Sequence, residues 1–287
     1  GCTNCKYAFN MRIRENSKFI FIATSSNYLE DRFMYDISHG IEILKSLGVA
    51  AIDIIVITDA PKDTLVAKCI NMSDVSFHIP SNLKDVIESA ECENLFVVSS
   101  CHGSIDGIDS VTPIKPFTLN QSLKNNKYAK NILVFLGQCF AGIFNFIDVR
   151  DENKNIVYIG ATDIDASLSY LITGCDWVAN ISVFALFQWI KTPLDIDGDG
   201  KCSISDLYKY VSYFTNNITQ QIEKSQNYGL VDAFVKLKLE EKQAQSPKGK
   251  LTLQIVTDAV ETIRNYIVPH QNTWMLNAIA AGNMNLE

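Results

Sequence analysis

Short apolar segments alternate with stretches of helical periodicity along the first 160 residues of this 287-residue chain. Helical spacing of apolar side chains is clearest over residues 31–47 and recurs near residues 81–91 and 117–129. The apolar segments read KFIFIAT (18–24), AIDIIVIT (51–58), NLFVVSS (94–100), NILVFLG (131–137) and NIVYIGA (155–161). Nearly continuous apolar strands separated by helices are typical of parallel sheets covered on both faces. The pattern predicts an α/β fold, a three-layer α/β/α sandwich with a mostly parallel central sheet of about six strands.

The length and the pattern favour one domain over residues 18–287, preceded by an N-terminal extension over residues 1–17. From about residue 207 the chain is predicted to be helical, interrupted by a polar surface loop at residues 237–250. Cys2 and Cys5 form a lone CxxC without a second pair at zinc spacing, so we do not expect metal there.

Composition and charge exclude several classes of partner. The formal net charge is −7 and the pI about 5.2, which disfavours nucleic acid, because phosphate binding needs a basic surface. The longest apolar run, WVANISVFALFQWI (177–190), is shorter than the roughly 20 residues that span a bilayer, and it predicts a buried helix. No signal peptide is recognisable, so we expect a soluble protein.

Two of the predicted strands end alike, with a reactive side chain and a nearby glycine. His102 and Gly103 follow the third strand, and Cys139 follows the fourth, with Gly142 three residues later. Ligands of open α/β sheets bind at the carboxyl ends of the strands, so His102 and Cys139 are expected on one rim. Cysteine attacks as a thiolate, and a neighbouring imidazole can take its proton. We further expect Gly103 to let the chain turn sharply, so that the N–H groups of Gly103 and Cys139 form an oxyanion hole.

The other cysteines and histidines have ordinary structural interpretations. A buried cysteine is usually an inert apolar side chain. Cys101 adjoins His102, but alternation along a strand points it to the opposite side, into the core. His39, His78 and His270 are interpreted as structural.

The histidine and cysteine motifs resemble those of a known enzyme family. HGS at 102–104 with Gly107, then an apolar strand and QC-x-x-G at 138–142, is similar to the His-Gly and Cys-x-x-Gly blocks of caspase-like cysteine peptidases of clan CD. Within that clan the sequence is most similar to the legumain family. The likeness begins at ATSSNYLEDRFMYD (23–36), including the spacings from Ala23 to Arg32 and from Arg32 to Asp36, and continues through VYIGATDIDASLSY and GCDW (157–177). It covers roughly residues 18 to 190.

This resemblance implies a caspase-like fold and a cysteine endopeptidase that acylates Cys139, with His102 as general base and acid. Glu30 stands where the family places a side chain that orients the histidine, and it departs from the family's residue. A second departure is Gly137, where legumains carry an acid two residues before the nucleophile. In the caspase family the interval after the nucleophile is cut on activation. The interval here is short, so we expect a single-chain enzyme.

The resemblance also places Arg32, Ser169 and Asp176 in the S1 pocket, which holds the residue before the scissile bond (P1). Arg32 alone favours an acidic P1 and Asp176 alone a basic one. Together they offer a donor and an acceptor, which suits a primary amide. We therefore rank Asn first as P1, Asp second and basic residues third.

The segment DIDGDGKCSISD (195–206) matches the pattern of an EF-hand calcium loop. The predicted ligands at loop positions 1, 3, 5, 7 and 12 are Asp195, Asp197, Asp199, the carbonyl of Lys201, and Asp206. Gly200 occupies position 6, and Asp206 replaces the usual Glu. The alternative is an Asp/Gly turn that caps the following helix, with Ser203 or Ser205 as N-cap. Calcium is the only cofactor we expect.

Two further functions are compatible with the same residues. A transamidase or peptide ligase uses the same acyl-enzyme, and the GPI-transamidase catalytic subunit shares the His-Gly and Cys blocks. A catalytically silent binding module is the other, although it would not need both His102 and Cys139. The expected partner in every case is a protein or peptide.

Overall fold

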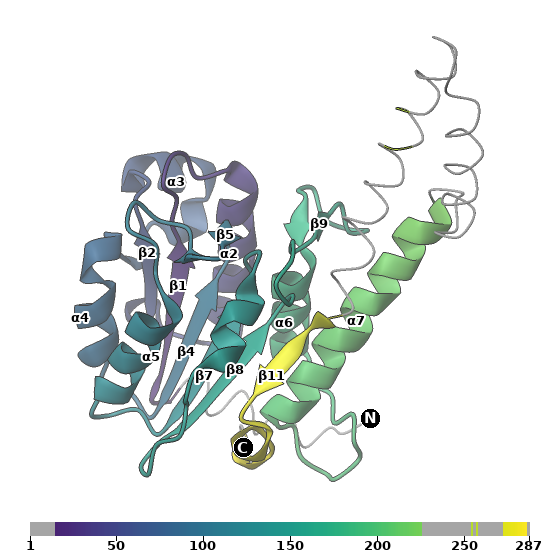
Figure 1. Cartoon of the computed structure of the whole chain (residues 1–287). Coiled ribbons are helices and arrows are strands. Elements are labelled where there is room, and N and C mark those ends of the chain that lie inside the picture. The colour runs from purple at the N-terminus through teal and green to yellow at the C-terminus, as the bar shows by residue number, and fades with distance from the viewer. Residues whose placement is uncertain (1–14, 226–253, 255–256, 258–271, 286–287) are drawn as a thin grey trace.

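The computed structural model describes residues 15–225, 254, 257 and 272–285. A seven-stranded sheet with the order β11-β8-β7-β4-β1-β2-β3 forms its centre (Figure 1). The strands are β1 (Ser17–Ala23), β2 (Ile54–Thr58), β3 (Ser76–His78), β4 (Asn94–Ser99), β7 (Asn131–Leu136), β8 (Asn155–Gly160) and β11 (Trp274–Leu276). All neighbouring strands are parallel except β11, which runs antiparallel to β8. The predicted three-layer sandwich with a mostly parallel sheet is therefore confirmed.

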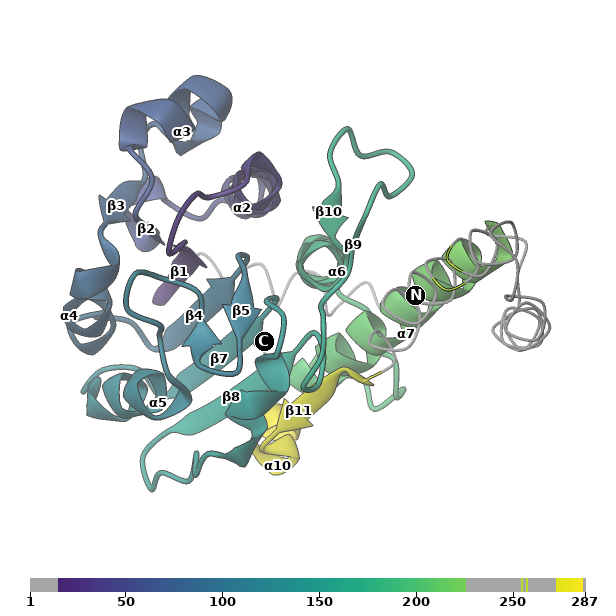
Figure 2. The ribbon, with the colours of Figure 1, turned by 45° about the horizontal axis from the view of Figure 1, so that its top comes forward.

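Helices cover both faces of the sheet because alternate strand residues point to opposite sides (Figure 2). Phe19 and Phe21 of β1 pack into one core, whereas Ile20 and Ile22 pack into the other. The first core lies under α2 (Asp31–Ser46), α3 (Lys62–Lys68), α6 (Ile181–Lys191), α7 (Ile204–Ser225) and α10 (Ala278–Asn283). The second lies under α4 (Leu83–Glu88), α5 (Pro116–Asn125) and the short 3₁₀ helix η4 (Ala141–Phe146).

All five predicted strands are present, and two strands of the seven-stranded sheet were missed. β3 has three residues, too few to show a period, and β11 comes from a C-terminal region that we predicted to be helical. The predicted buried helix over residues 177–190 begins only at Ile181. The reason is local, since the Asn180 side chain accepts a hydrogen bond from the Val183 N–H (3.1 Å) and so caps α6.

Several predictions concern residues that the structure does not describe. Cys2, Cys5, His270, the loop at 237–250 and most of the N-terminal extension lie outside the described residues. Within the described part of the C-terminal region, α7 begins at Ile204, close to the predicted start of the helical part. No helix among the described residues is long and apolar enough to cross a bilayer.

A row of amides sets the register at the amino ends of four strands. Asn94, Asn131 and Asn155 are paired across β4, β7 and β8, and Ser17 of β1 pairs with Asn94. Asn155 donates to Asn131 and Asn131 donates to Asn94, each through Nδ2 to Oδ1 at 3.0 Å. Because these strands start level, their carboxyl ends also lie level, with Ser99 paired to Leu136 and Leu136 to Gly160.

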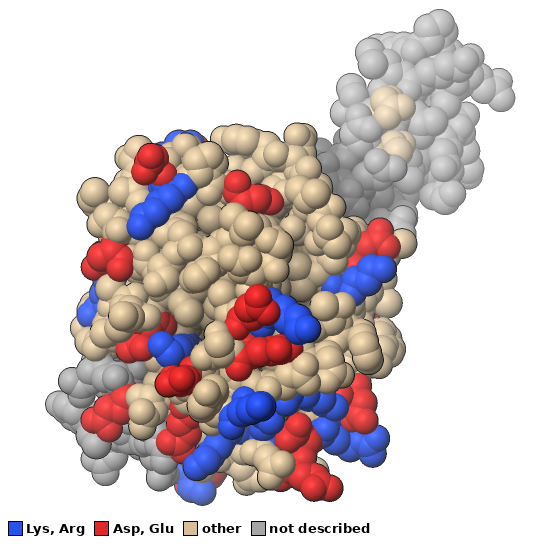
Figure 3. Space-filling model, turned by 90° about the vertical axis from the view of Figure 1, so that its left-hand side faces the viewer, with Lys and Arg blue, Asp and Glu red and all other residues tan. Residues whose placement is uncertain are grey.

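Charged side chains are interspersed on the face that carries α4 and α5 (Figure 3). Acidic and basic groups alternate over the lower half of this view. Uncharged side chains dominate the upper half, toward the carboxyl ends of the strands.

Candidate active site

His102 and Cys139 follow adjacent parallel strands at the same level. Ser99 and Leu136 are register partners, and each candidate residue lies three positions further along its own chain segment. The two segments also touch, because a Cβ placed on Gly103 would lie 2.3 Å from the carbonyl oxygen of Cys139. The structure thus brings both segments to one rim of the sheet, as predicted from the strand ends.

Gly103 has a different reason for being glycine from the one we predicted. The expected sharp turn is made by Gly107, whose φ is 132°, in the hairpin of β5 (Gly103–Ser104) and β6 (Gly107–Ile108). At Gly103 the constraint is space, since a Cβ would also lie 2.4 Å from Cγ of Gln138. The glycine therefore allows the histidine segment to approach the backbone of the nucleophile segment.

Glu30 holds the imidazole of His102. The Nε2 atom of His102 lies 2.5 Å from Oε1 of Glu30, and the ring packs edge-on against Phe33 with centroids 5.0 Å apart. A carboxylate can only accept, so Nε2 carries the proton and the neutral imidazole keeps its lone pair on Nδ1. Nδ1 is therefore the nitrogen that can act as a base.

Glu30 also binds Arg32, which in turn binds Ser169. The Arg32 guanidinium donates to Oε2 of Glu30 and to Oγ of Ser169, both at 2.6 Å, and stacks over Phe33. The hydrogen bond from Arg32, with a smaller contribution from His102, holds the pKa of Glu30 below its usual value. A row of contacts therefore joins Ser169, Arg32, Glu30 and His102.

The loop before β9 (Ser169–Tyr170) covers Cys139. The Ser167 N–H donates to Sγ of Cys139 at 3.2 Å, and the Phe140 N–H donates to the Asp165 carbonyl at 2.8 Å. Phe140 has a φ of 57°, so the chain bends in the left-handed region directly after the half-buried cysteine. The loop therefore places a backbone hydrogen-bond donor beside the candidate nucleophile.

Asp176 is not brought to the other two predicted pocket residues. It is exposed in the turn between β9 and β10 (Ala179–Asn180), and no contact with Arg32 or Ser169 is found within the described chain. The absence of an acid at Gly137 has a steric cause. A Cβ there would lie 2.5 Å from Val183 Cγ2 and 2.6 Å from the Ser99 carbonyl oxygen.

The remaining cysteines and histidines fit their structural interpretation where they are described. Cys101 is buried in the core under α5, and burial raises the pKa of its thiol to about 12. His39 stacks on Phe184 and lies at an angle against Trp177, and burial lowers its pKa. His78 is half-buried at the end of β3.

Sequence reasoning missed a set of buried polar residues beneath the site. Asp36, Asn180 and Ser100 are at most 3% exposed, and Asp36 accepts hydrogen bonds from Ser100, Asn180 and Trp177. Asp36 occurs in the motif that carried the resemblance, but no role was derived for it. Its position on the apolar face of α2 was the signal, because an unpaired carboxylate is costly to bury.

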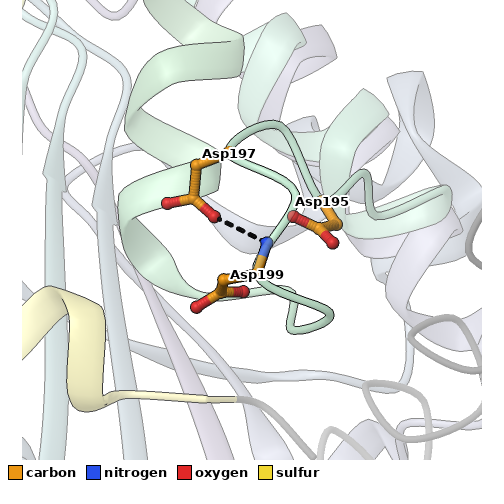
Figure 4. A group of neighbouring side chains, drawn as sticks. All are labelled: Asp195, Asp197 and Asp199. Carbon is orange, nitrogen blue, oxygen red and sulfur yellow. Dashed lines mark hydrogen bonds between the residues drawn. The ribbon is translucent and has the colours of Figure 1, made fainter.

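The predicted calcium loop forms only part of the expected ligand set (Figure 4). Asp195, Asp197 and Asp199 place one carboxylate oxygen each within 4.8 Å of one another, which fits a small cation. Asp206 lies elsewhere and is fully buried. Its Oδ1 accepts from the N–H groups of Ile196 and Asp197, and its Oδ2 from the N–H and hydroxyl of Ser203.

This arrangement is also the predicted helix cap. Ser203 precedes α7, and Asp206 at the third helical position accepts its N–H, as in a capping box. Lys201, predicted to offer its carbonyl to the ion, donates its N–H to Asp199 (2.9 Å), and Lys209 binds Asp197 (3.2 Å). The three-aspartate cluster and the cap thus use different residues of one loop.

A cavity of about 600 Å³ opens elsewhere on the same rim, beyond β2 and β3. It is lined mainly by apolar groups of α4, α5 and the 110–114 loop, including Ile79, Val111 and Pro113. None of its lining residues is a predicted site residue. The candidate catalytic pair therefore does not belong to this cavity.

Comparisons with known proteins leave the function to be argued from the site. No family model matches the chain, and no curated protein matches it. Solved structures similar to it include drICE, at 13% identity and a TM-score of 0.39, covering 71% of this chain and 84% of that one. They also include the NADP-bound pyrroline carboxylate reductase of Plasmodium falciparum, at 12% identity and a TM-score of 0.31, covering 90% and 82% respectively. Both TM-scores are too low to indicate a function for this protein.

Proposed function

We propose that this protein is a cysteine endopeptidase that cleaves peptide bonds through Cys139 and His102. The observation that carries the proposal is the contact between the two strand ends, with Glu30 bound to the imidazole of His102. A thiol and an imidazole held by a carboxylate are the groups that nucleophilic catalysis by cysteine requires.

In the proposed first step, Nδ1 of His102 takes the thiol proton and the thiolate of Cys139 attacks the scissile carbonyl carbon. The imidazolium that forms is stabilised by the Glu30 carboxylate. The Cys139 N–H, which has no acceptor among the described residues, is available to the developing oxyanion together with the Gly103 N–H.

Collapse of the tetrahedral intermediate releases the amine, which takes the proton from His102, and leaves a thioester on Cys139. Water then attacks the thioester with His102 again as base, which frees the new carboxylate and restores the thiol. An amine in place of water would give ligation instead of hydrolysis.

For P1 we propose Asn first and Asp second. Glu30 already pairs with Arg32, so the positive charge of the pocket is largely balanced and a neutral amide is favoured over a carboxylate. The Ser169 hydroxyl lies beside the guanidinium, and Asp176 would supply the amide's acceptor if its turn folds over the substrate. Its exposed position makes Asp176 the least supported of the three pocket residues.

We also propose that Asp195, Asp197 and Asp199 bind Ca²⁺. Asp195 accepts the N–H groups of Gly198 and Gly200, so the loop already curls around the cluster. These residues would hold the ion as a structural element, and no catalytic step passes through it.

The test is cleavage of a peptide library, with P1 read by mass spectrometry, for the wild type, Cys139→Ala, His102→Ala and the control Cys101→Ala. We expect both dyad variants to lose turnover by at least 10³-fold and the control to keep it. Turnover by Cys139→Ala would exclude this nucleophile. A peptidyl electrophile that fails to label Cys139 would favour the binding module, and ligated product in added amine would favour the transamidase.

A further inference from the structure

Asp36 is a buried carboxylate that accepts hydrogen bonds from three donors on two other segments of the chain. It lies in the second turn of α2 and is 3% exposed. Its Oδ2 accepts from the Ser100 hydroxyl at 2.8 Å, and its Oδ1 accepts from the Trp177 indole at 2.8 Å and from the Asn180 N–H at 3.1 Å. Figure 2 shows α2 beside the β9–β10 hairpin, which supplies the last two donors.

One of these hydrogen bonds leads to the histidine segment. Ser100 lies two residues before His102, and its N–H is held by the Ile22 carbonyl of β1 at 3.0 Å. The Ser100 side chain therefore ties the chain just beyond β4 to α2, the same helix whose start carries Glu30 and Arg32.

The other hydrogen bonds lead to the cysteine segment. Asn180, held by Asp36 through its backbone, donates its side-chain amide to the Gly137 carbonyl at 2.7 Å and to the Ser167 hydroxyl at 3.4 Å. Ser167 in turn donates its N–H to Sγ of Cys139. Two paths from one carboxylate thus end at the two candidate catalytic residues.

Packing alone does not explain a carboxylate at this position. Burial raises the pKa of Asp36 to about 6, against the lowering effect of its donors, so the ionised form is held at a cost. An apolar side chain would fill the space without that cost. Arg32 on α2 and Cys175 on the hairpin are titratable groups that interact electrostatically with Asp36.

We propose that Asp36 is a positioning residue. It fixes the distance between the His102 and Cys139 segments, and it also fixes the position of the β9–β10 hairpin. The inference rests on the proposed peptidase function and deepens it. Loss of the carboxylate charge should misplace the dyad while leaving the seven-stranded sheet intact, because all three donors lie outside its strands.

The two hydrogen-bond paths from Asp36 predict different effects on kcat and on KM. Asp36→Asn keeps the volume but turns one acceptor into a donor, which faces existing donors. We expect kcat to fall about 10- to 100-fold, since small misplacements of reacting groups have effects of that size. Ser100→Ala, which cuts only the path to His102, should lower kcat with little change in KM. Trp177→Phe, which loosens only the hairpin carrying Ser169, should mainly raise KM.

The decisive measurement separates this inference from the proposed function. The rate of Cys139 alkylation by iodoacetamide is followed from pH 5 to 9 by peptide mass spectrometry, alongside peptide turnover and melting temperature. The proteins are the wild type, His102→Ala, Asp36→Asn and the control Asp59→Asn, which removes a rim carboxylate whose hydrogen bond among the described residues is to the Ser25 N–H.

We expect slower alkylation and an altered pH profile in both His102→Ala and Asp36→Asn, and wild-type behaviour in Asp59→Asn. The melting temperature of Asp36→Asn should stay well above the assay temperature, so that the variant is compared in its folded state. If His102→Ala leaves alkylation unchanged, the proposed dyad fails. If His102→Ala slows alkylation but Asp36→Asn matches the wild type in alkylation and kcat, only the role of Asp36 fails. A fall in activity that merely follows a fall in melting temperature would also overturn the positioning role, because it would indicate a structural one.

Discussion

At the scale of single residues, two glycines decide how closely the candidate catalytic segments approach. Gly103 faces the Cys139 carbonyl and Gly137 faces Val183, and a side chain at either would meet an atom within about 2.5 Å. Neither glycine has a positive φ, so both are present for space and not for backbone conformation.

Gly103→Ala should therefore separate the two segments. We expect a loss of about 1–3 kcal/mol in the free energy of unfolding from overpacking, together with loss of peptide turnover. Urea denaturation and peptide cleavage would measure the two effects. Gly282→Ala in α10 is the control, since its nearest neighbour would be 3.8 Å away. If Gly103→Ala folds and cleaves like this control, the close approach is not required.

The raised pKa of Asp36 predicts how the stability of the protein changes with pH. Its pKa in the folded state, about 6, is above the ordinary value of 3.8, so the folded protein binds the proton more tightly than the unfolded chain. The stabilisation is complete below about pH 4 and is lost as pH rises through 6, by about 3 kcal/mol in total. The wild type should lose most of this free energy of unfolding between pH 4 and pH 7, relative to Asp36→Asn measured at the same pH values. A difference that does not change with pH would contradict the raised pKa.

At the scale of elements, helix α2 and the amide row do most to align the site. The start of α2 supplies Glu30, Arg32, Phe33 and Asp36, whose spacing places them on the turn nearest the rim. The amide row at Asn94, Asn131 and Asn155 aligns the opposite ends of the strands. A one-residue slip would send each strand's side chains to the wrong face.

Asn131→Ala should destabilise the sheet because Asn131 is the central amide and takes part in two hydrogen bonds. We expect a loss of about 1–3 kcal/mol in unfolding free energy. The comparison is Asn153→Ala, an exposed position in the loop before β8. Equal urea midpoints for the two variants would show that the row contributes nothing to stability.

At the scale of the whole molecule, α7 joins the aspartate loop to the candidate pocket. The helix has 22 residues and is therefore about 33 Å long. It begins at the aspartate loop, near the amino ends of the strands (Figure 1), and its residues Phe214 and Ile218 pack with Leu168 and Ile172 beside β9. This length separates the loop from the catalytic rim, so we expect an ion there to act on stability.

Calcium added after chelator treatment should stabilise the wild type and so raise its melting temperature. At a hundredfold excess over Kd, the free energy of unfolding should rise by on the order of 3 kcal/mol. Magnesium should do less. Asp195→Ala with Asp199→Ala should abolish the calcium effect, whereas Asp206→Asn should lower stability even in chelator, because it weakens the cap of α7. A wild-type melting temperature indifferent to calcium would leave the loop as a helix cap only.

The sequence alone determined the layers of this fold and the two reactive strand ends. Nearly continuous apolar strands and helical stripes are local patterns, so the sandwich, five strands, His102 and Cys139 could be predicted from them. β3, β11 and the late start of α6 could not, because a three-residue strand and a single capping amide carry too little local signal.

Only the tertiary structure decided what surrounds the reactive pair. Three features of the site depend on contacts between residues distant in sequence. They are the contact of Glu30 with His102, the hydrogen bonds that Asp36 accepts from Ser100 and from the β9–β10 hairpin, and the close approach of Gly103 to Cys139. The same holds for Asp206, which the loop pattern assigned to an ion and the folded chain uses as a cap. Spacing along a chain limits which residues can meet. The orientation of each donor and acceptor is set by packing, because buried polar groups must find partners wherever the fold places them.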